Sequence, residues 1–157
     1  MKLYILRHAH AHPGKPDSER PVSPKGRDTI ERLARFLKAT KYAKPAVIHH
    51  STLLRAKQTA RILTAEMQWL IPTHEFSGME PASPVSSAAQ LYNSIAENTL
   101  LVGHEPHLSR LISHLLTGSE KAVDLQLKKG GLVCLEKSEK TVPHWKLLWS
   151  LPPKFYR

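Results

Sequence analysis

The sequence lacks the marks of a secreted or membrane-spanning protein. Its 157 residues contain one cysteine, Cys134, so no internal disulfide can form, which is usual in a reducing compartment. No apolar run is long enough to cross a bilayer. The apolar run at the N-terminus is only as long as a strand and is followed at once by charge, unlike a secretory signal peptide. We therefore expect a cytoplasmic protein.

Motifs for binding metals or nucleic acids are also missing. The ten histidines include an alternating trio, His8, His10 and His12, but no cysteine or carboxylate accompanies them at zinc-site spacing. No basic run is interleaved with aromatic residues, although the formal net charge is +10. That charge fits a polyanionic substrate, an acidic protein partner or an ordinary basic surface. We expect no metal and no cofactor, and neither a membrane nor a nucleic acid as partner.

Hydrophobic patterning alternates between strands and helices along the chain. Residues 3–6 form a continuous apolar run that suits a strand buried on both faces, and Ser23 followed by Pro24 is typical of a helix N-terminus. With no internal repeat or linker, we expect one domain over residues 1–157. Its predicted fold is an α/β three-layer sandwich, with a mostly parallel central sheet and helices on both faces. The expected strands are 3–6, 46–50, 99–104, 132–136 and 144–151, and the expected helices are 24–40, 53–67, 86–96 and 105–117.

The last expected strand begins at His144 and shows a period of two. Trp145, Leu147, Trp149 and Leu151 stand at alternate positions. This pattern predicts a half-buried strand. Residues 152–157 are expected to form an irregular tail.

Residues of similar chemistry follow three of the predicted strands. Arg7 and His8 follow the first strand, Arg55 lies in the first turn of the helix after the second, and His104 ends the strand at 99–104. Taken singly, each has an ordinary interpretation as a loop or surface residue. Together, at the carboxyl edge of a parallel sheet, two guanidiniums and two imidazoles predict a pocket for a phosphoryl group. Ser51 either caps the helix that follows it, which we favour, or contacts the phosphate.

Several short motifs in this order resemble those of the histidine phosphatase superfamily, also called phosphoglycerate mutase-like, and within it the SixA-type phosphohistidine phosphatases. They are Leu-Arg-His-Ala-His-Ala at 6–11, Val-Ser-Pro-Lys-Gly-Arg at 22–27, Ser-Thr-Leu-Leu-Arg-Ala-Lys-Gln-Thr-Ala at 51–60, Val-Gly-His-Glu-Pro-His-Leu at 102–108 and Lys-Lys-Gly-Gly-Leu at 128–132. Ala9 stands where the superfamily usually has glycine, and this small residue still permits close packing near a phosphate. The Glu-Ser-x-x-Asn continuation of the mutases is absent after His8, which argues against a mutase.

The resemblance implies a role for each residue of the predicted pocket. His8 would be the nucleophile and would form a phosphohistidine intermediate. Arg7 and Arg55 would bind the phosphoryl oxygens and stabilise the transition state. His104, expected to be protonated, would donate to another oxygen. Because the arginines supply positive charge, the chemistry would be independent of metal.

The proton donor decides which substrate fits best. Glu80 occupies roughly the right region for this role, and Glu105 is a second candidate that adjoins His104. A phosphohistidine leaves as an imidazole, which needs less acid assistance than an alkoxide. The sequence therefore predicts a phosphatase for phosphohistidine on a protein, such as a carrier in a signalling phosphorelay. The alternatives are a small-molecule phosphomonoesterase using the same pocket and a non-catalytic module that binds phosphate or nucleic acid.

Overall fold

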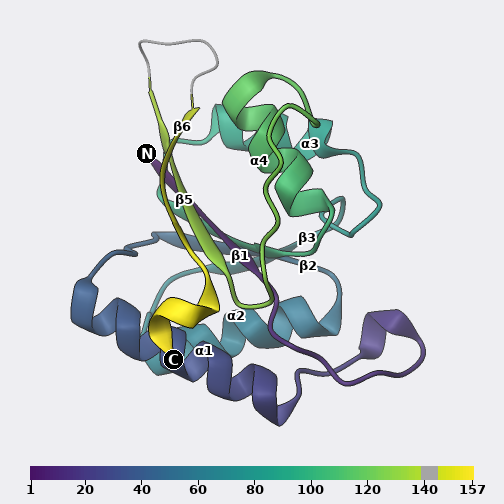
Figure 1. Cartoon of the computed structure of the whole chain (residues 1–157), viewed down its shortest axis with the longest axis vertical. Helices are drawn as coiled ribbons and strands as arrows, with labels where there is room; N and C mark the ends of the chain where they lie inside the picture. Colours follow the sequence, from purple (N-terminus) through teal and green to yellow (C-terminus); the bar gives the residue numbers. More distant parts are fainter. Residues whose placement is uncertain (139–144) are drawn as a thin grey trace.

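A six-stranded sheet forms the centre of residues 1–138 and 145–157, the part of the chain that the computed structural model describes (Figure 1). Helices cover both faces of this sheet. The elements in chain order are β1 (Lys2–Arg7), η1 (Asp17–Glu19), α1 (Pro24–Thr40), β2 (Val47–Ser51), α2 (Leu54–Met67), β3 (Thr73–Phe76), α3 (Val85–Ser94), β4 (Thr99–Gly103), α4 (His107–Thr117), β5 (Leu132–Lys137), β6 (Trp145–Leu151) and η2 (Pro153–Tyr156).

The strand order, β3-β2-β4-β1-β5-β6, places the first strand inside the sheet. β3, β2, β4 and β1 pair in parallel, whereas β5 runs antiparallel to β1 and β6 antiparallel to β5. The predicted α/β fold with a mostly parallel sheet is therefore confirmed. As a consequence, the carboxyl ends of β1, β2 and β4 lie at the same edge of the sheet.

Two hydrophobic cores, one on each face of the sheet, explain the continuous apolar run of β1. Tyr4 and Leu6 point into the core beneath α1 and α2. Leu3 and Ile5 point into the core beneath α3 and α4. Because successive side chains of a strand face opposite sides, only a strand covered on both faces is apolar at every position. In the described residues, no helix is both long and apolar enough to cross a membrane.

The start of α1 follows the predicted capping pattern and fixes the loop after β1. The Ser23 side chain accepts a hydrogen bond from the Gly26 backbone N–H over 3.1 Å, and Pro24 occupies the first turn. A Cβ added at Gly26 would lie 2.2 Å from the backbone oxygen of His10. The missing side chain thus allows α1 to pack directly on the loop that leaves β1.

A bulge in the pairing of β5 with β6 changes the side-chain pattern at the end of the chain. Trp149 and Leu151 pack on the same side of the sheet as α1 and α2, whereas Trp145 packs on the opposite side. Leu147 and Leu148 are exposed. The predicted strand is present, but the single half-buried face is wrong, because the extra residue of a bulge reverses the alternation.

Two further predictions concern the C-terminal region, namely the start of the last strand at His144 and the tail at 152–157. His144, the first residue of the predicted strand, lies outside the described residues. The tail is not irregular as predicted, because η2 forms a short 3-10 helix. Its Tyr156 is buried and donates a hydrogen bond to the backbone oxygen of Gly130 over 2.6 Å.

Candidate functional site

The carboxyl ends of β1 and β4 meet the first turn of α2 at one edge of the sheet. Because Arg7 pairs with Gly103, His8 and His104 leave the sheet at the same level. The backbone N–H of His8 donates to the Gly103 oxygen over 3.0 Å, and the two imidazole centroids are 4.9 Å apart. The charges of Arg7 and Arg55 both act on His8. The structure thus brings together four predicted residues, Arg7, His8, Arg55 and His104, which we call the strand-end site.

His8 uses one ring nitrogen to fix its orientation and presents the other to the site. Its Nδ1 lies 2.7 Å from the backbone oxygen of Ala9, and because that oxygen can only accept, Nδ1 carries the proton. Nε2 therefore keeps a free lone pair. Burial lowers the pKa of His8 to about 4, and the charges of Arg55 and Arg7 add to this effect. At neutral pH, Nε2 of His8 is available to act as a nucleophile.

The main chain of Leu127 holds the guanidinium of Arg7. Nη1 of Arg7 donates to the Leu127 carbonyl oxygen over 2.7 Å. The backbone N–H of Leu127 donates to Oε1 of Glu105 over 2.9 Å, and the other carboxylate oxygen of Glu105 accepts from Ser109. Glu105 therefore holds the backbone at Leu127 in place, and the Leu127 carbonyl oxygen in turn orients Arg7. Both of its carboxylate oxygens are used in this way, which does not suit the role of proton donor.

Arg55 is buried in the first turn of α2 and is paired with a residue that the sequence analysis missed. Its Nη1 donates to the backbone oxygen of Asp17 over 2.9 Å, and its Nη2 lies 3.1 Å from Oδ2 of the same residue. Asp17 begins η1, in the loop between β1 and α1, and also pairs with Arg20 at 2.9 Å. Hydrogen bonds from Arg20 and Arg55 hold the pKa of the Asp17 carboxyl below its usual value. An ionised carboxylate thus occupies one edge of the Arg55 guanidinium.

His104 is almost completely buried and is joined to Ser51. Nε2 of His104 lies 2.7 Å from the Ser51 hydroxyl, which also accepts a hydrogen bond from the Leu53 backbone N–H over 3.2 Å. The N-cap of α2 is Leu53, so the expectation that Ser51 caps this helix is wrong. Burial lowers the pKa of His104 to about 3, and the neighbouring His8 and Arg55 act in the same direction. His104 is therefore neutral in the free protein, and its protonation beside a phosphoryl group stays a prediction.

Glu80, the predicted proton donor, lies in a network of hydrogen bonds near the strand-end site. Oε1 accepts from the Thr52 hydroxyl over 2.7 Å, and Oε2 accepts from Ser83 and from the Gly78 backbone over 2.9 and 2.7 Å. Partial burial alone would raise the pKa of Glu80, but these hydrogen bonds outweigh it and the pKa is lowered. At neutral pH Glu80 is ionised and carries no proton to donate.

Three buried nitrogens around the strand-end site have no hydrogen-bond partner among the described residues. They are Nε of Arg7, Nε of Arg55 and Nδ1 of His104. A buried polar atom without a partner is costly, so such atoms indicate a place for a ligand or water. Two of the three belong to guanidiniums, which bind oxyanions well. The geometry therefore suits a tetrahedral oxyanion placed against Nε2 of His8.

The comparison with protein-family models agrees with this geometry. Residues 3–80, which include three of the four residues of the strand-end site, match the model of the histidine phosphatase superfamily, branch 1. The matched segment is similar to this superfamily and makes up just under half of the chain. The resemblance seen in the sequence motifs is thereby confirmed. No curated protein sequence matches the chain.

Solved structures of several phosphatases share the fold over nearly the whole chain. The protein histidine phosphatase SixA complexed with tungstate matches with a TM-score of 0.87 and 20% identity, covering 100% of both chains. A putative phosphohistidine phosphatase SixA from Agrobacterium tumefaciens matches with a TM-score of 0.79 and 23% identity over 97% of both chains. An alpha-ribazole phosphatase from Shigella flexneri matches with a TM-score of 0.78 and 16% identity, over 98% of this chain and 97% of the other. At these identities the similarity establishes the fold.

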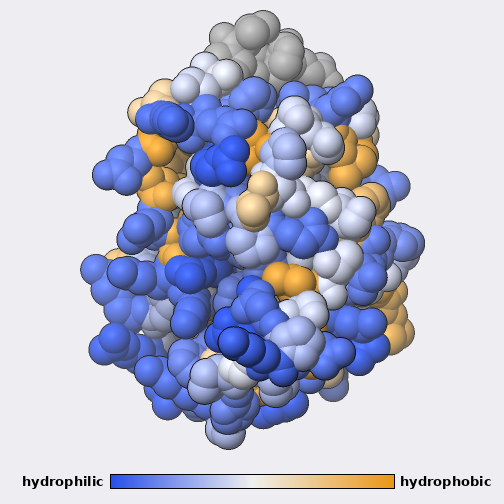
Figure 2. Space-filling view, turned by 90° about the vertical axis from the view of Figure 1, so that its right-hand side faces the viewer, coloured by the Kyte–Doolittle hydropathy of each residue, from blue (hydrophilic) through white to orange (hydrophobic). Residues whose placement is uncertain are grey.

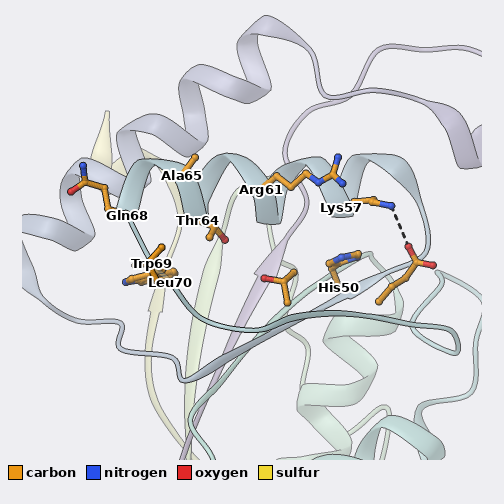
Figure 3. A pocket seen from close by; sticks show the side chains of 10 residues that line it. His50, Lys57, Arg61, Thr64, Ala65, Gln68, Trp69 and Leu70 are labelled. Atoms are coloured by element: carbon orange, nitrogen blue, oxygen red, sulfur yellow. Dashed lines mark ion pairs between the residues drawn. The ribbon is translucent and has the colours of Figure 1, made fainter.

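The surface of the protein is largely hydrophilic on the side where η1 lies, with scattered apolar patches (Figure 2). Away from the strand-end site, a cavity of about 760 Å³ lies between α2 and β3 (Figure 3). Lys57 and Glu75 form an ion pair of 3.8 Å at its edge, and Trp69 and Leu70 lie at its other end. The cavity contains no residue of the strand-end site.

The histidines of the described residues do not gather into a metal site. Within residues 1–138 and 145–157, no three histidine, cysteine or acidic side chains are arranged to hold a metal ion. The alternating histidines illustrate this: His10 forms a 2.7 Å contact with the Ser23 hydroxyl, while His12 is exposed. Metal independence itself stays a prediction.

The buried histidines make stability depend on pH. Burial lowers the pKa values of His8, His49 and His104 to about 4, 4 and 3, below the unfolded value near 6.5. At pH values between the folded and the unfolded pKa, the unfolded chain binds more protons than the folded chain. The free energy of unfolding therefore falls as the pH drops below 6.5. On going from pH 7.5 to 5.5 we expect a loss of about 1 kcal/mol for each of the three histidines.

Urea unfolding at the two pH values measures this loss. The His49→Gln variant should lose about 1 kcal/mol less than wild type over this pH range, because His49 is one of the buried histidines whose pKa is lowered and lies outside the strand-end site. An unfolding free energy that is equal at both pH values would contradict the prediction.

Proposed function

We propose that this chain is a phosphatase that hydrolyses phosphohistidine on proteins through a phosphorylated His8. The observation that carries the proposal is the free Nε2 of a neutral, buried His8 beside two guanidiniums and three unpartnered nitrogens. The protein histidine phosphatase SixA, whose fold is similar, was solved with tungstate, an oxyanion. This likeness supports an oxyanion at the corresponding edge of the present sheet.

The first step would transfer the phosphoryl group to His8. The lone pair of Nε2 forms a bond to phosphorus while the P–N bond of the substrate breaks, and its electron pair goes to the departing imidazole. Arg7 and Arg55 would hold the phosphoryl oxygens and neutralise their charge in a site largely shielded from water. In the second step the oxygen of a water molecule bonds to phosphorus while the P–Nε2 bond breaks. The electron pair of that bond returns to Nε2 of His8, and inorganic phosphate leaves with the protons of the water.

The state of His104 would change when the substrate enters. Burial keeps His104 neutral in the free protein. A phosphoryl dianion nearby raises the pKa of an imidazole, because the negative charge favours the cation. His104 would then take up a proton and donate a hydrogen bond from Nδ1 to a phosphoryl oxygen. The hydroxyl of Ser51 would hold the ring in place from Nε2.

The leaving group favours phosphohistidine over phosphate esters. Glu80 is ionised and hydrogen-bonded, so the strand-end site has no carboxylic acid ready to protonate an alkoxide. An imidazole, with a conjugate-acid pKa near 6.5, can leave after taking a proton from water. The alternative of a small-molecule phosphomonoesterase is supported by the similar folds of an alpha-ribazole phosphatase and of a phosphoserine phosphatase from Entamoeba histolytica.

Substrate comparison tests the two activities against each other. We expect kcat/KM for a phosphohistidine-bearing carrier protein to exceed that for phosphoserine by about a hundredfold or more, because one general acid contributes about that factor to reactions that need it. Both assays would follow release of inorganic phosphate with the same enzyme preparation. A higher kcat/KM for the ester would favour the phosphomonoesterase.

Asp17 should compete with phosphate for Arg55. The Asp17→Asn variant removes the carboxylate charge from the guanidinium, so we expect inorganic phosphate to bind about three to ten times more tightly than to wild type. Calorimetric titration with phosphate measures this change. The matched control is Glu136→Gln, which removes a carboxylate paired with Lys146 at the end of the sheet opposite to the strand-end site. Equal phosphate affinity in wild type and Asp17→Asn would show that Asp17 does not compete.

A further inference from the structure

We propose that Lys25 and Lys129 form a second anion subsite beside the strand-end site, which binds a carboxylate side chain close to the phosphohistidine of a protein substrate. This inference rests on the proposed function and narrows its substrate to phosphohistidines with acidic surroundings. It assigns part of the net charge of +10 to recognition.

A cavity of about 470 Å³ between the start of α1 and the segment before β5 provides the space. Its lining includes His10, Lys25, Arg32 and Lys129. Asp28 also lines the cavity, and its carboxylate is paired with Arg32 at 2.9 Å. In the part of the chain that the structure describes, no carboxylate lies within 4.0 Å of Lys25 or Lys129. The cavity therefore offers two ammonium groups without a partner of opposite charge.

Lys129 links this cavity to the strand-end site. The next residue, Gly130, donates its backbone N–H to the Arg7 oxygen over 3.1 Å, so the chain at Lys129 runs beside the end of β1. The charge of Lys129 acts on both His8 and His10, which lie two positions apart after that strand. An anion held by Lys129 would thus lie close to a phosphoryl group on His8.

The crowding of positive charge at this rim favours an anionic occupant. Partial burial and the like charges of Arg7, Arg20, Lys25 and Arg55 lower the pKa of Lys129. Like charges held close together repel one another, and a bound anion relieves this repulsion. Asp17 does not serve here, because its carboxylate is already shared by Arg20 and Arg55.

The exposure of the two lysines favours a carboxylate on a protein surface. Lys25 and Lys129 are both exposed, and an ammonium group on a flexible stem suits a carboxylate whose position is not tightly fixed. The buried guanidiniums of the strand-end site suit a phosphoryl group held at one place. The exposed lysines would thus recognise the acidic surroundings of the phosphohistidine, and the buried arginines would bind the phosphoryl group that is transferred.

Binding of two matched peptides tests the subsite without requiring turnover. Each peptide carries a non-hydrolysable phosphonate analogue of phosphohistidine, flanked by glutamates in one peptide and by glutamines in the other. We expect wild type to bind the glutamate peptide about tenfold more tightly, and the Lys25→Gln/Lys129→Gln variant to bind the two peptides with affinities within about twofold. The preference of wild type should weaken with added salt.

A control variant and a control ligand make the result specific. Lys38→Gln/Lys121→Gln removes two exposed charges that do not line the cavity and should keep the tenfold preference. The glutamine peptide, which brings no carboxylate to the subsite, should bind all three proteins with affinities within about threefold, which shows that the strand-end site is intact. A wild type that does not distinguish the peptides, or a Lys25→Gln/Lys129→Gln variant that still does, would overturn the subsite. If phosphohistidine is not hydrolysed, the proposed function fails while the peptide preference still decides the subsite.

Discussion

Replacement of His8 with alanine is expected to reduce phosphohistidine hydrolysis by about four orders of magnitude or more, because removal of a nucleophile leaves only the binding groups. The same change should abolish the phosphorylated enzyme intermediate. Nε2 of His8 has a free lone pair, and its direction is fixed by the hydrogen bond of the opposite ring nitrogen. Rapid quenching with labelled substrate, followed by location of the labelled residue, measures both effects.

Phosphate binding and a control variant distinguish loss of the nucleophile from loss of the fold. The variant should still bind inorganic phosphate, since Arg7 and Arg55 remain in place. His12→Ala is the matched control, because this histidine lies in the same loop but has an exposed side chain; its turnover and labelling should equal those of wild type. Turnover by His8→Ala within tenfold of wild type, or label on another residue in wild type, would show that His8 is not the nucleophile.

Replacement of Arg55 with lysine is expected to lower kcat by a factor of about one hundred to one thousand. Lysine keeps the positive charge but loses the planar fork that can contact two oxygens at once. The factor is the usual cost of removing one donor aimed at charge that develops in the transition state. The main effect should therefore fall on kcat, with a smaller change in KM. Steady-state kinetics with the phosphohistidine carrier measure both constants.

Arg61 provides the comparison on the same helix. It is exposed, and Arg61→Lys leaves the strand-end site untouched, so we expect wild-type kinetics. Thermal unfolding of both variants checks the fold. Among the described residues, the ion pair of the buried Arg55 is with Asp17, whose exposed carboxylate can be solvated by water when the arginine is changed. A kcat within threefold of wild type in Arg55→Lys would contradict the assigned contact with the transferred group.

Much of the fold could be predicted because its signals are local. The apolar run of β1 and the Ser23-Pro24 start of α1 depend on residues next to one another in the sequence. The positions of Arg7, His8 and His104 followed from one topological rule, that ligands bind at the carboxyl ends of parallel strands. Arg55 followed from its place in the first turn of a helix.

The sequence motifs did not specify the contacts around the site residues. Asp17 lies in a loop with no periodic pattern, and only the folded chain brings it to Arg55, 38 positions away. The charge state of His104 depends on burial by neighbours from several elements. The hydrogen bonds that keep Glu80 ionised come from Thr52, Gly78 and Ser83, two of them inside a turn. A motif specifies the residue, but not the surroundings that set its protonation.

The link from Glu105 through Leu127 to Arg7 has a consequence for how freely this region can vary. Both bonds at Leu127 involve main-chain atoms, so almost any residue type could make them. The Leu127 side chain is buried in the core beneath α4, so its packing in that core is what limits the choice of residue. The spacing between α4 and β5 is different, because an inserted or deleted residue would move the carbonyl away from the guanidinium of Arg7. In this segment we expect substitutions to be tolerated far more readily than insertions or deletions.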